Sequence, residues 1–207
     1  MRPVLACQKA VTFLDKKMHL CDYQSNKIQQ GGNIMNNVAV IYKTQYGTTK
    51  QYAQWIAEAL EATLFEVSEI KPAQLMSFDT IVYGGGLYAG GIDGVKLVTK
   101  NPCKNLVVFT VGLDDSTITD FSEVLTRNFT QELLSQTTIF HLRGGIDYSK
   151  LNLIHKGMMA FVKNQAAKKA ESELTINDRL LLETYGKQIS FVDKDTIAPL
   201  VAFVKGQ

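Results

Sequence analysis

The stretch Val38-Ala39-Val40-Ile41-Tyr42, followed after Lys43 by Thr44-Gln45-Tyr46-Gly47-Thr48-Thr49, decides the fold. The first five residues form a continuous apolar run, which is typical of a strand buried on both faces of a sheet. From Thr48 to Ala62 the apolar residues recur at helical spacing, so a helix is predicted directly after the strand. The sequence therefore predicts a strand, a polar loop and a helix in immediate succession.

Further units of this kind follow along the chain. We expect four more strands, at residues 64–67, 80–83, 105–111 and 137–142, and helices at 93–99, 119–134, 151–169, 178–185 and from Asp195, as its cap, to Val204. This alternation predicts an α/β fold with a doubly wound, five-stranded parallel sheet and helices on both faces. Such sheets bind ligands beyond the carboxyl ends of their strands, which indicates the loops at 43–49, 84–91 and 112–115.

Composition excludes several classes of protein. The chain has 207 residues, with 22 Lys and Arg against 20 Asp and Glu, and a formal net charge of +2, which gives no sign of nucleic-acid binding. No stretch approaches the roughly 18 consecutive apolar residues of a membrane span. Its cysteines, Cys7, Cys21 and Cys103, lack CxxC spacing, and its three histidines lack the spacing of a helical zinc site. We therefore expect a cytoplasmic protein without a metal.

Residues 1–34 differ from the rest of the chain. They show no sustained period and carry five basic side chains against two acidic ones. Gly31-Gly32 can be encoded by a purine-rich, ribosome-binding type of sequence just before the codon of Met35. We expect Met35 to be the natural start and residues 1–34 to be translated leader, with a genuine flexible arm as the alternative. The domain proper then spans residues 35–207.

The loop from Thr44 to Thr49 has the chemistry of an anion site. It offers three Thr hydroxyls and backbone N–H groups at the start of a helix, whose dipole favours negative charge. The spacings of a nucleoside-triphosphate loop and of a dinucleotide fingerprint are both absent. A Thr-rich helix cap without a ligand is the alternative interpretation.

At these residues the chain resembles the flavodoxin family. The likeness rests on Thr44-x-Tyr46-Gly47-Thr48-Thr49 after the first strand, on the Gly-rich turn at 84–86, and on Val111-Gly112-Leu113-Asp114, and it covers residues 35 to about 145. It implies the strand order 2-1-3-4-5 and FMN as cofactor. By resemblance, the phosphate of FMN would be held by Thr44, Gln45, Tyr46, Gly47, Thr48 and Thr49.

The same resemblance assigns the other two loops to the isoalloxazine ring. One side of the ring would be flanked by Gly86, Leu87, Tyr88, Ala89 and Gly90, and the other by Val111, Gly112, Leu113 and Asp114. Tyr88 can stack on a planar ring, although a flexible turn with Tyr88 packed on the surface is also open. Asp114 and Asp115 can equally cap the helix that follows.

The end of the chain resembles the menaquinone-dependent protoporphyrinogen dehydrogenase branch of the superfamily. The residues that carry this likeness are Gly144, Gly145, Tyr148, Met158-Met159 and the ending from Phe191 to Val204, and no catalytic residue is transferred through it. The basic amphipathic helix at 151–169 can lie on a membrane surface or cover a quinone. We favour the simpler expectation that it packs on the sheet with its lysines in solvent.

The resulting prediction is an FMN-binding domain for electron transfer or flavin-dependent oxidoreduction, with an enzyme favoured. Its partner would be a small molecule such as a quinone or a porphyrinogen, or else a redox protein. A flavin-free interaction domain is the third alternative. Small electron carriers of this family are commonly very acidic, whereas this core is nearly neutral, which favours the small-molecule reaction.

Overall fold

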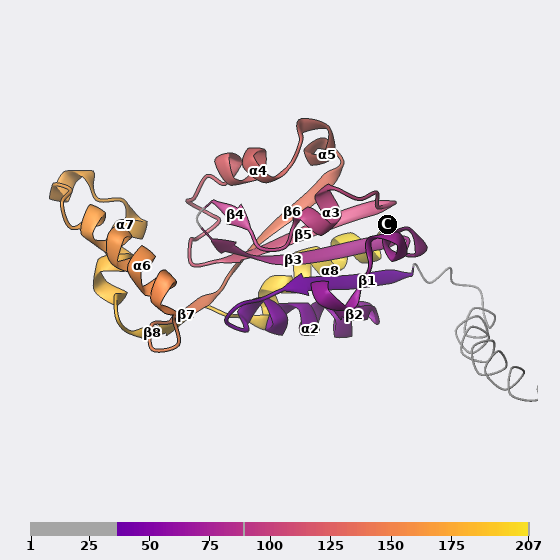
Figure 1. Cartoon of the computed structure of the whole chain (residues 1–207), viewed down its shortest axis with the longest axis horizontal. Coiled ribbons are helices and arrows are strands. Elements are labelled where there is room, and N and C mark those ends of the chain that lie inside the picture. The colour runs from indigo at the N-terminus through magenta and orange to yellow at the C-terminus, as the bar shows by residue number, and fades with distance from the viewer. Residues whose placement is uncertain (1–36, 89, 207) are drawn as a thin grey trace, which may run out of the picture. The chain divides into compact units, whose positions relative to one another are not determined.

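The computed structural model describes residues 37–88 and 90–206 of the chain (Figure 1). The expectation of a leader or arm at residues 1–34, with Met35 as the start, lies outside the described residues. The same holds for Ala89, one of the predicted cofactor-binding positions.

A parallel five-stranded sheet forms the centre of the domain, in the order β2-β1-β3-β5-β6. Its strands are β1 (Val38–Lys43), β2 (Thr63–Glu66), β3 (Thr80–Tyr88), β5 (Asn105–Gly112) and β6 (Thr137–Arg143). A two-residue strand, β4 (Gly91–Ile92), pairs antiparallel with the end of β3. The predicted doubly wound parallel sheet and its strand order are confirmed.

Helices cover both faces of this sheet, as Figure 1 shows. Residues of α2 (Thr48–Leu60) and α8 (Ala198–Lys205) belong to one buried apolar cluster. The opposite cluster includes residues of η2 (Pro72–Ser77) and α3 (Lys96–Thr99), with side chains from α4 (Ser122–Asn128) and α5 (Gln131–Ser135) packed against it. The continuous apolar strands are explained by these two layers, since a strand covered on both sides has no solvent face.

Two of the predicted helices are each divided in the structure. The helix expected at 119–134 is divided into α4 and α5, because Phe129 is buried in an extended conformation and Thr130 caps the second helix. The last helix begins as a 3-10 turn, η4 (Lys194–Ile197), before α8. Its capping side chain is Asp193, which accepts the N–H of Asp195, so the predicted cap at Asp195 is wrong.

The predicted turn at Gly84-Gly85-Gly86 is also wrong, because β3 continues through all three glycines. A Cβ atom at Gly84 would lie 2.1 Å from Cζ of Phe109 on the neighbouring strand, and one at Gly85 would lie 2.6 Å from Cγ2 of Ile92. The glycines therefore permit close packing of neighbouring side chains against the backbone of a central strand.

An inserted segment, residues 148–187, leaves the sheet after β6. It lies between the strands of a small antiparallel hairpin, β7 (Gly145–Asp147) and β8 (Gln188–Ser190), and contains α6 (Leu153–Ala166), η3 (Glu171–Glu173) and α7 (Ile176–Thr184). Figure 1 shows α6 and α7 side by side beyond the ends of the central strands. Among α6 residues only Ala166 is buried, so the expectation that this helix packs on the sheet is wrong.

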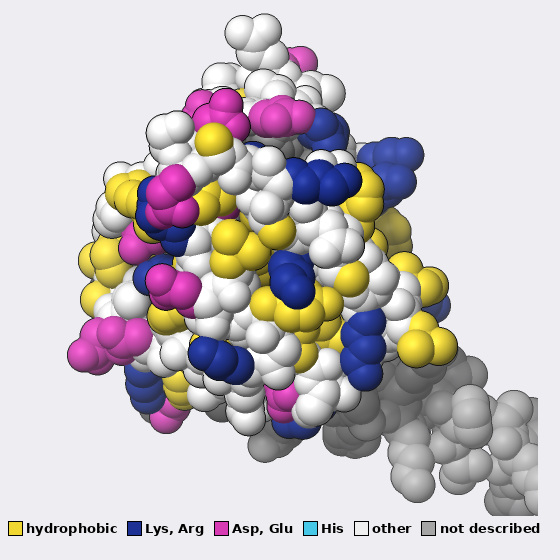
Figure 2. Space-filling view, turned by 90° about the vertical axis from the view of Figure 1, so that its left-hand side faces the viewer, with side chains coloured by type: hydrophobic (Ala, Val, Ile, Leu, Met, Phe, Trp, Pro, Cys, Tyr) yellow, Lys and Arg dark blue, Asp and Glu magenta, His cyan; other side chains and the backbone are white. Residues whose placement is uncertain are grey.

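The surface of this end of the molecule is mixed in character. Hydrophobic and basic side chains lie next to one another on it (Figure 2). Leu153 and Ile154 at the start of α6 are 87% and 74% exposed. Within the described ranges, no helix has the length and apolar character that a bilayer span requires.

Candidate functional site

A cavity of about 570 Å³ lies at the carboxyl ends of β1, β3 and β5, where the predicted loops meet. The predicted residues that line it are Thr44, Gln45, Tyr46, Thr48, Thr49, Gly86, Leu87, Tyr88, Val111, Gly112 and Leu113. Gly47, Gly90 and Asp114 do not line it, although Gly47 and Asp114 are adjacent in sequence to residues that do. Three segments that are far apart in sequence therefore converge on one site.

The first wall of the cavity is the start of α2. Gly47 precedes the helix with φ 95°, in the left-handed region, and its N–H donates to Oγ1 of Thr44 at 3.0 Å. The first bond along the helix joins the N–H of Gln51 to the carbonyl of Gly47. The amides of Thr48 and Thr49 come before that bond, and this first turn of the described helix contains no acidic residue. These amides, together with the two Thr hydroxyls, form a neutral donor set suited to an anion.

The second wall is the end of β3. Tyr88 is half-buried there, and burial, followed by the proximity of Tyr46 and Asp93, raises the pKa of its phenol to about 12. Tyr88 therefore presents a neutral aromatic ring to the cavity over the physiological pH range. Gly90, which does not line the cavity, has φ 76°, and a Cβ added there would lie 2.5 Å from Nη1 of Arg127.

The third wall is the loop after β5. Leu113 and Gly112 line the cavity, and Arg143 binds the same loop. The Nε of Arg143 donates to the carbonyl oxygen of Leu113 at 3.4 Å, and its Nη1 lies 3.3 Å from the carboxylate of Asp115. Burial raises the pKa of the Asp114 carboxyl, and the charge of Arg143 opposes this shift. Asp115 accepts the N–H and the hydroxyl of Thr117 and so stabilises a turn, but the next helix begins only at Ser122, so the alternative that Asp114 and Asp115 cap it is wrong.

The sequence interpretation missed a fourth wall, which comes from the hairpin and the inserted segment. Its members are Gly144, Gly145, Ile146, Leu151, His155, Gly157, Met158, Met159, Phe161 and Val162. The Gly144-Gly145 pair is a signal that could have indicated this wall, because it follows a strand of the parallel sheet, as the loops after β1 and β5 do. A Cβ at Gly144 would lie 2.8 Å from Cγ1 of Val111, so this position requires close backbone approach.

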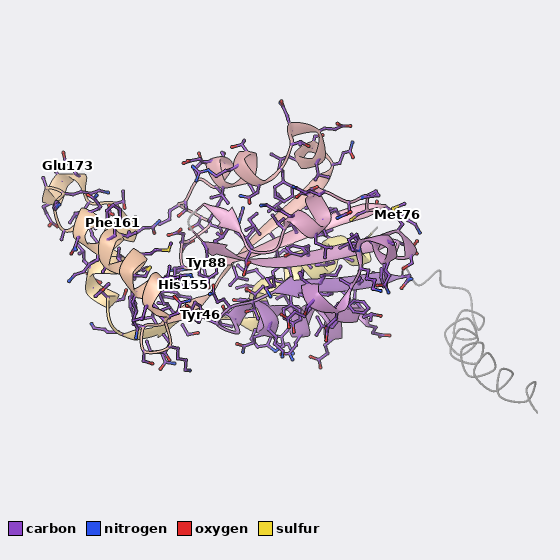
Figure 3. All side chains as sticks on the ribbon, viewed as in Figure 1. Tyr46, Met76, Tyr88, His155, Phe161 and Glu173 are labelled. Carbon is purple, nitrogen blue, oxygen red and sulfur yellow. The ribbon has the colours of Figure 1, made fainter. Side chains whose placement is uncertain are left out.

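Three rings from three separate segments meet at the cavity, as Figure 3 shows for Tyr46, Tyr88 and His155. The imidazole of His155 is stacked on Tyr88, with ring centroids 5.1 Å apart and an angle of 16° between the planes. Its Nδ1 lies 2.6 Å from the hydroxyl of Tyr46. The first turn of α6 is thereby attached to the first and second walls.

Comparison with protein families identifies the domain. The family model described as "Flavodoxin domain" matches residues 39–173, which is more than half of the chain. The chain belongs to the flavodoxin domain family. The predicted resemblance is thus confirmed for the domain, while the likeness of the tail to protoporphyrinogen dehydrogenases stays a prediction.

Solved structures with similarity to this flavodoxin domain include a flavodoxin from the domain Archaea, with 14% identity over 52% of this chain and 82% of that chain and a TM-score of 0.38. A flavoprotein in complex with FMN from Lactobacillus acidophilus has 12% identity over 52% and 92%, with a TM-score of 0.35. The flavodiiron core Flv1 from Synechocystis has 16% identity over 61% and 34%, with a TM-score of 0.40. A comparison with curated proteins returns no match.

Proposed function

We propose that this flavodoxin domain binds FMN non-covalently in the cavity at the carboxyl ends of its strands and performs flavin-dependent oxidoreduction. The observation that carries the proposal is the convergence of an anion-binding helix start with a cavity flanked by Tyr88 and Leu113. Its volume of about 570 Å³ falls in the range of roughly 300–1,000 Å³ that is usual for cofactor and ligand pockets.

The donor set fits the phosphate of FMN. The amides at the start of α2, with the hydroxyls of Thr44, Thr48 and Thr49, offer neutral hydrogen-bond donors where the helix dipole favours an anion. Thr49 is 2% exposed, so its position is fixed by packing in the core. Preorganised donors of this kind lose little conformational entropy when the phosphate binds.

The remaining walls fit a planar ring. Tyr88 supplies an aromatic surface, and Leu113 supplies an apolar one from the opposite loop. Gly86 and Gly112 line the cavity without side chains, which permits a flat ring to approach the backbone closely. Bound FMN would supply the electron-accepting and electron-donating chemistry, while the chain binds and orients it and limits its contact with water.

Titration of the purified, flavin-depleted protein with FMN tests this proposal. We expect one FMN to bind per chain with quenching of flavin fluorescence, and we expect the protein to release FMN on denaturation. Riboflavin, which has the same ring without the phosphate, should bind at least tenfold more weakly, because it leaves the amides of α2 without their anion. A protein that takes up neither flavin is not a flavoprotein, and the flavin-free interaction domain would then replace the proposal.

A small-molecule reaction is favoured over electron transfer to a redox protein. The inserted segment supplies a wall of the cavity through α6, so the site has contacts for a ligand beyond those for the cofactor. These contacts are mostly apolar, which suits a quinone or a porphyrinogen, the substrates that the tail resemblance implies. Anaerobic reoxidation of the FMN-loaded, reduced protein should be faster with a naphthoquinone than with a cytochrome; the reverse order would indicate an electron carrier.

A further inference from the structure

The wall that α6 adds to the cavity contains one polar side chain. The residues that the inserted segment contributes are Leu151, His155, Gly157, Met158, Met159, Phe161 and Val162. All except His155 present apolar groups or a glycine backbone. Phe161 and Val162 remain 64% and 47% exposed, so this part of the cavity is open to a ligand from solvent.

His155 is held in a defined orientation. Its backbone N–H donates to Oδ1 of the helix cap Asn152 at 2.8 Å, and its ring is stacked on Tyr88. Its Nδ1 lies 2.6 Å from the Tyr46 hydroxyl, and the oxygen of that hydroxyl lies 3.4 Å from the backbone N–H of Asn152. The orientation of the side chain is therefore held by its Nδ1 contact with Tyr46 and by ring contacts with Tyr88 and Tyr46.

One hydrogen-bond arrangement leaves an N–H donor on the imidazole. The hydroxyl of Tyr46 can donate to Nδ1 of His155 while its oxygen accepts the N–H of Asn152. In this arrangement the neutral imidazole carries its proton on Nε2. Within the described ranges Nε2 has no hydrogen-bond partner, so this arrangement gives His155 one N–H donor for a ligand.

We propose that His155 is a specificity-determining residue that selects ligands with an apolar aromatic body and a carbonyl oxygen, by donating Nε2–H to that oxygen. The body of the ligand lies against Met158, Phe161 and their apolar neighbours on α6, while the carbonyl meets the single donor of that wall. This inference rests on the proposed function, since the ligand is the molecule that exchanges electrons with the flavin. It adds the residue that recognises the ligand and the atom through which it does so.

Two probes that differ in the carbonyl groups test the assignment. Menadione (2-methyl-1,4-naphthoquinone) has the aromatic body and the carbonyl oxygens, and 2-methylnaphthalene has a similar body without them. Equilibrium dialysis of each oxidised, FMN-loaded protein gives the two dissociation constants without any turnover. His155→Ala should weaken menadione binding by about three- to tenfold, the usual net contribution of one neutral hydrogen bond, and leave 2-methylnaphthalene unchanged.

Two further variants separate recognition from pocket shape. His155→Gln keeps an N–H donor and should recover part of the lost menadione affinity. Lys156→Ala changes an exposed neighbour on the same helix that does not line the cavity, and both probes should bind as they do to the unaltered protein. Equal weakening of both probes by His155→Ala would mean that His155 only shapes the pocket, and this result overturns the proposal.

The remaining outcomes are equally decisive. An unchanged menadione affinity in His155→Ala, or no menadione binding by the unaltered protein, also overturns the proposal. The flavin absorbance of the same samples reports FMN content independently. If the protein holds FMN but does not discriminate between the probes, only the role of His155 is refuted. If the protein holds no FMN, the proposed function is refuted, and the probe comparison on that protein still tests His155.

Discussion

The hydroxyl of Tyr52 accepts a hydrogen bond from the backbone N–H of Asp193 at 3.1 Å, across 141 residues of sequence. It also donates to the carbonyl oxygen of Arg143 at 2.7 Å. Arg143 lies before the inserted segment and Asp193 lies after it, so one buried side chain of α2 ties both ends of the insertion to the sheet. The cavity is positioned by the same connection, since α2 supplies its first wall and α6 its fourth.

We expect Tyr52→Phe to lower the free energy of unfolding by about 1–3 kcal/mol, because it removes two part-buried hydrogen bonds, each of which contributes about 0.5–1.5 kcal/mol. Urea denaturation followed by circular dichroism measures this change. Tyr42→Phe is the matched control: Tyr42 is 5% exposed in the same apolar cluster, but its hydroxyl makes no hydrogen bond to the described residues. A similar loss in both variants would show that the two hydrogen bonds of Tyr52 contribute nothing.

The central sheet was predictable from the sequence because each of its strands is short, apolar and followed by a polar loop. Ala39, Val40 and Ile41 illustrate this, since all three are fully buried and no solvent face interrupts the run. The positions of the loops at 43–49 and 112–115 in the site were also predictable, because the carboxyl ends of parallel strands meet at one edge of the sheet. Most of the predicted site residues are accordingly found around one cavity.

The fourth wall was not predictable, because its contacts are not local. His155 reaches Tyr46 across 109 residues, and no periodicity of α6 distinguishes a helix that walls a cavity from one that packs on a sheet. The turn predicted at glycines 84–86 was wrong for a related reason. Glycine is a turn signal in isolation, but Gly84 is required by the ring of Phe109 opposite it on β5, and the sequence does not show the register that pairs these two residues.

Gly47→Ala should weaken FMN binding through backbone strain alone. No atom lies within 4 Å of the added Cβ, but the residue has φ 95°, a conformation that costs an L-residue about 1–2 kcal/mol. Relief of this strain would shift the amides at the start of α2 that hold the phosphate in our proposal. We expect about a tenfold rise in the dissociation constant of FMN, measured by fluorescence titration.

Gly186→Ala is the control for that experiment. Gly186 has φ 83° and equally open surroundings, but it does not line the cavity. Both variants should lose similar stability in urea, and only Gly47→Ala should lose FMN affinity. If both lose affinity equally, general destabilisation rather than the geometry of α2 explains the effect.

The thiol of Cys103 should react slowly with alkylating reagents. Burial raises its pKa from 9.0 to about 11, and the thiolate is the reactive form. At pH 8 the native protein should therefore be alkylated about a hundredfold more slowly at Cys103 than the urea-unfolded chain, as followed by mass spectrometry of the Cys103 peptide. The rate should continue to rise up to about pH 11. Equal rates for native and unfolded protein would contradict the raised pKa.

Asp178 should make the inserted segment sensitive to acid. Its carboxylate accepts hydrogen bonds from Nζ of Lys169 at 2.7 Å and from the N–H and hydroxyl of Thr175 at 2.9 and 2.8 Å, so it joins the end of α6 to the start of α7. The bond from Lys169, followed by those from Thr175, lowers the pKa of Asp178 from 3.8 to about 2. A lowered native pKa means that the stabilisation is complete above about pH 4 and is lost as the pH falls towards 2.

Urea unfolding at pH 6 should therefore show Asp178→Asn to be less stable than the unaltered protein, and the difference should vanish near pH 2. Glu183→Gln, which neutralises an exposed carboxylate on the same helix, should follow the unaltered protein at every pH. A difference for Asp178→Asn that persists undiminished at pH 2 would mean that the charge of Asp178 does not stabilise the α6–α7 pair.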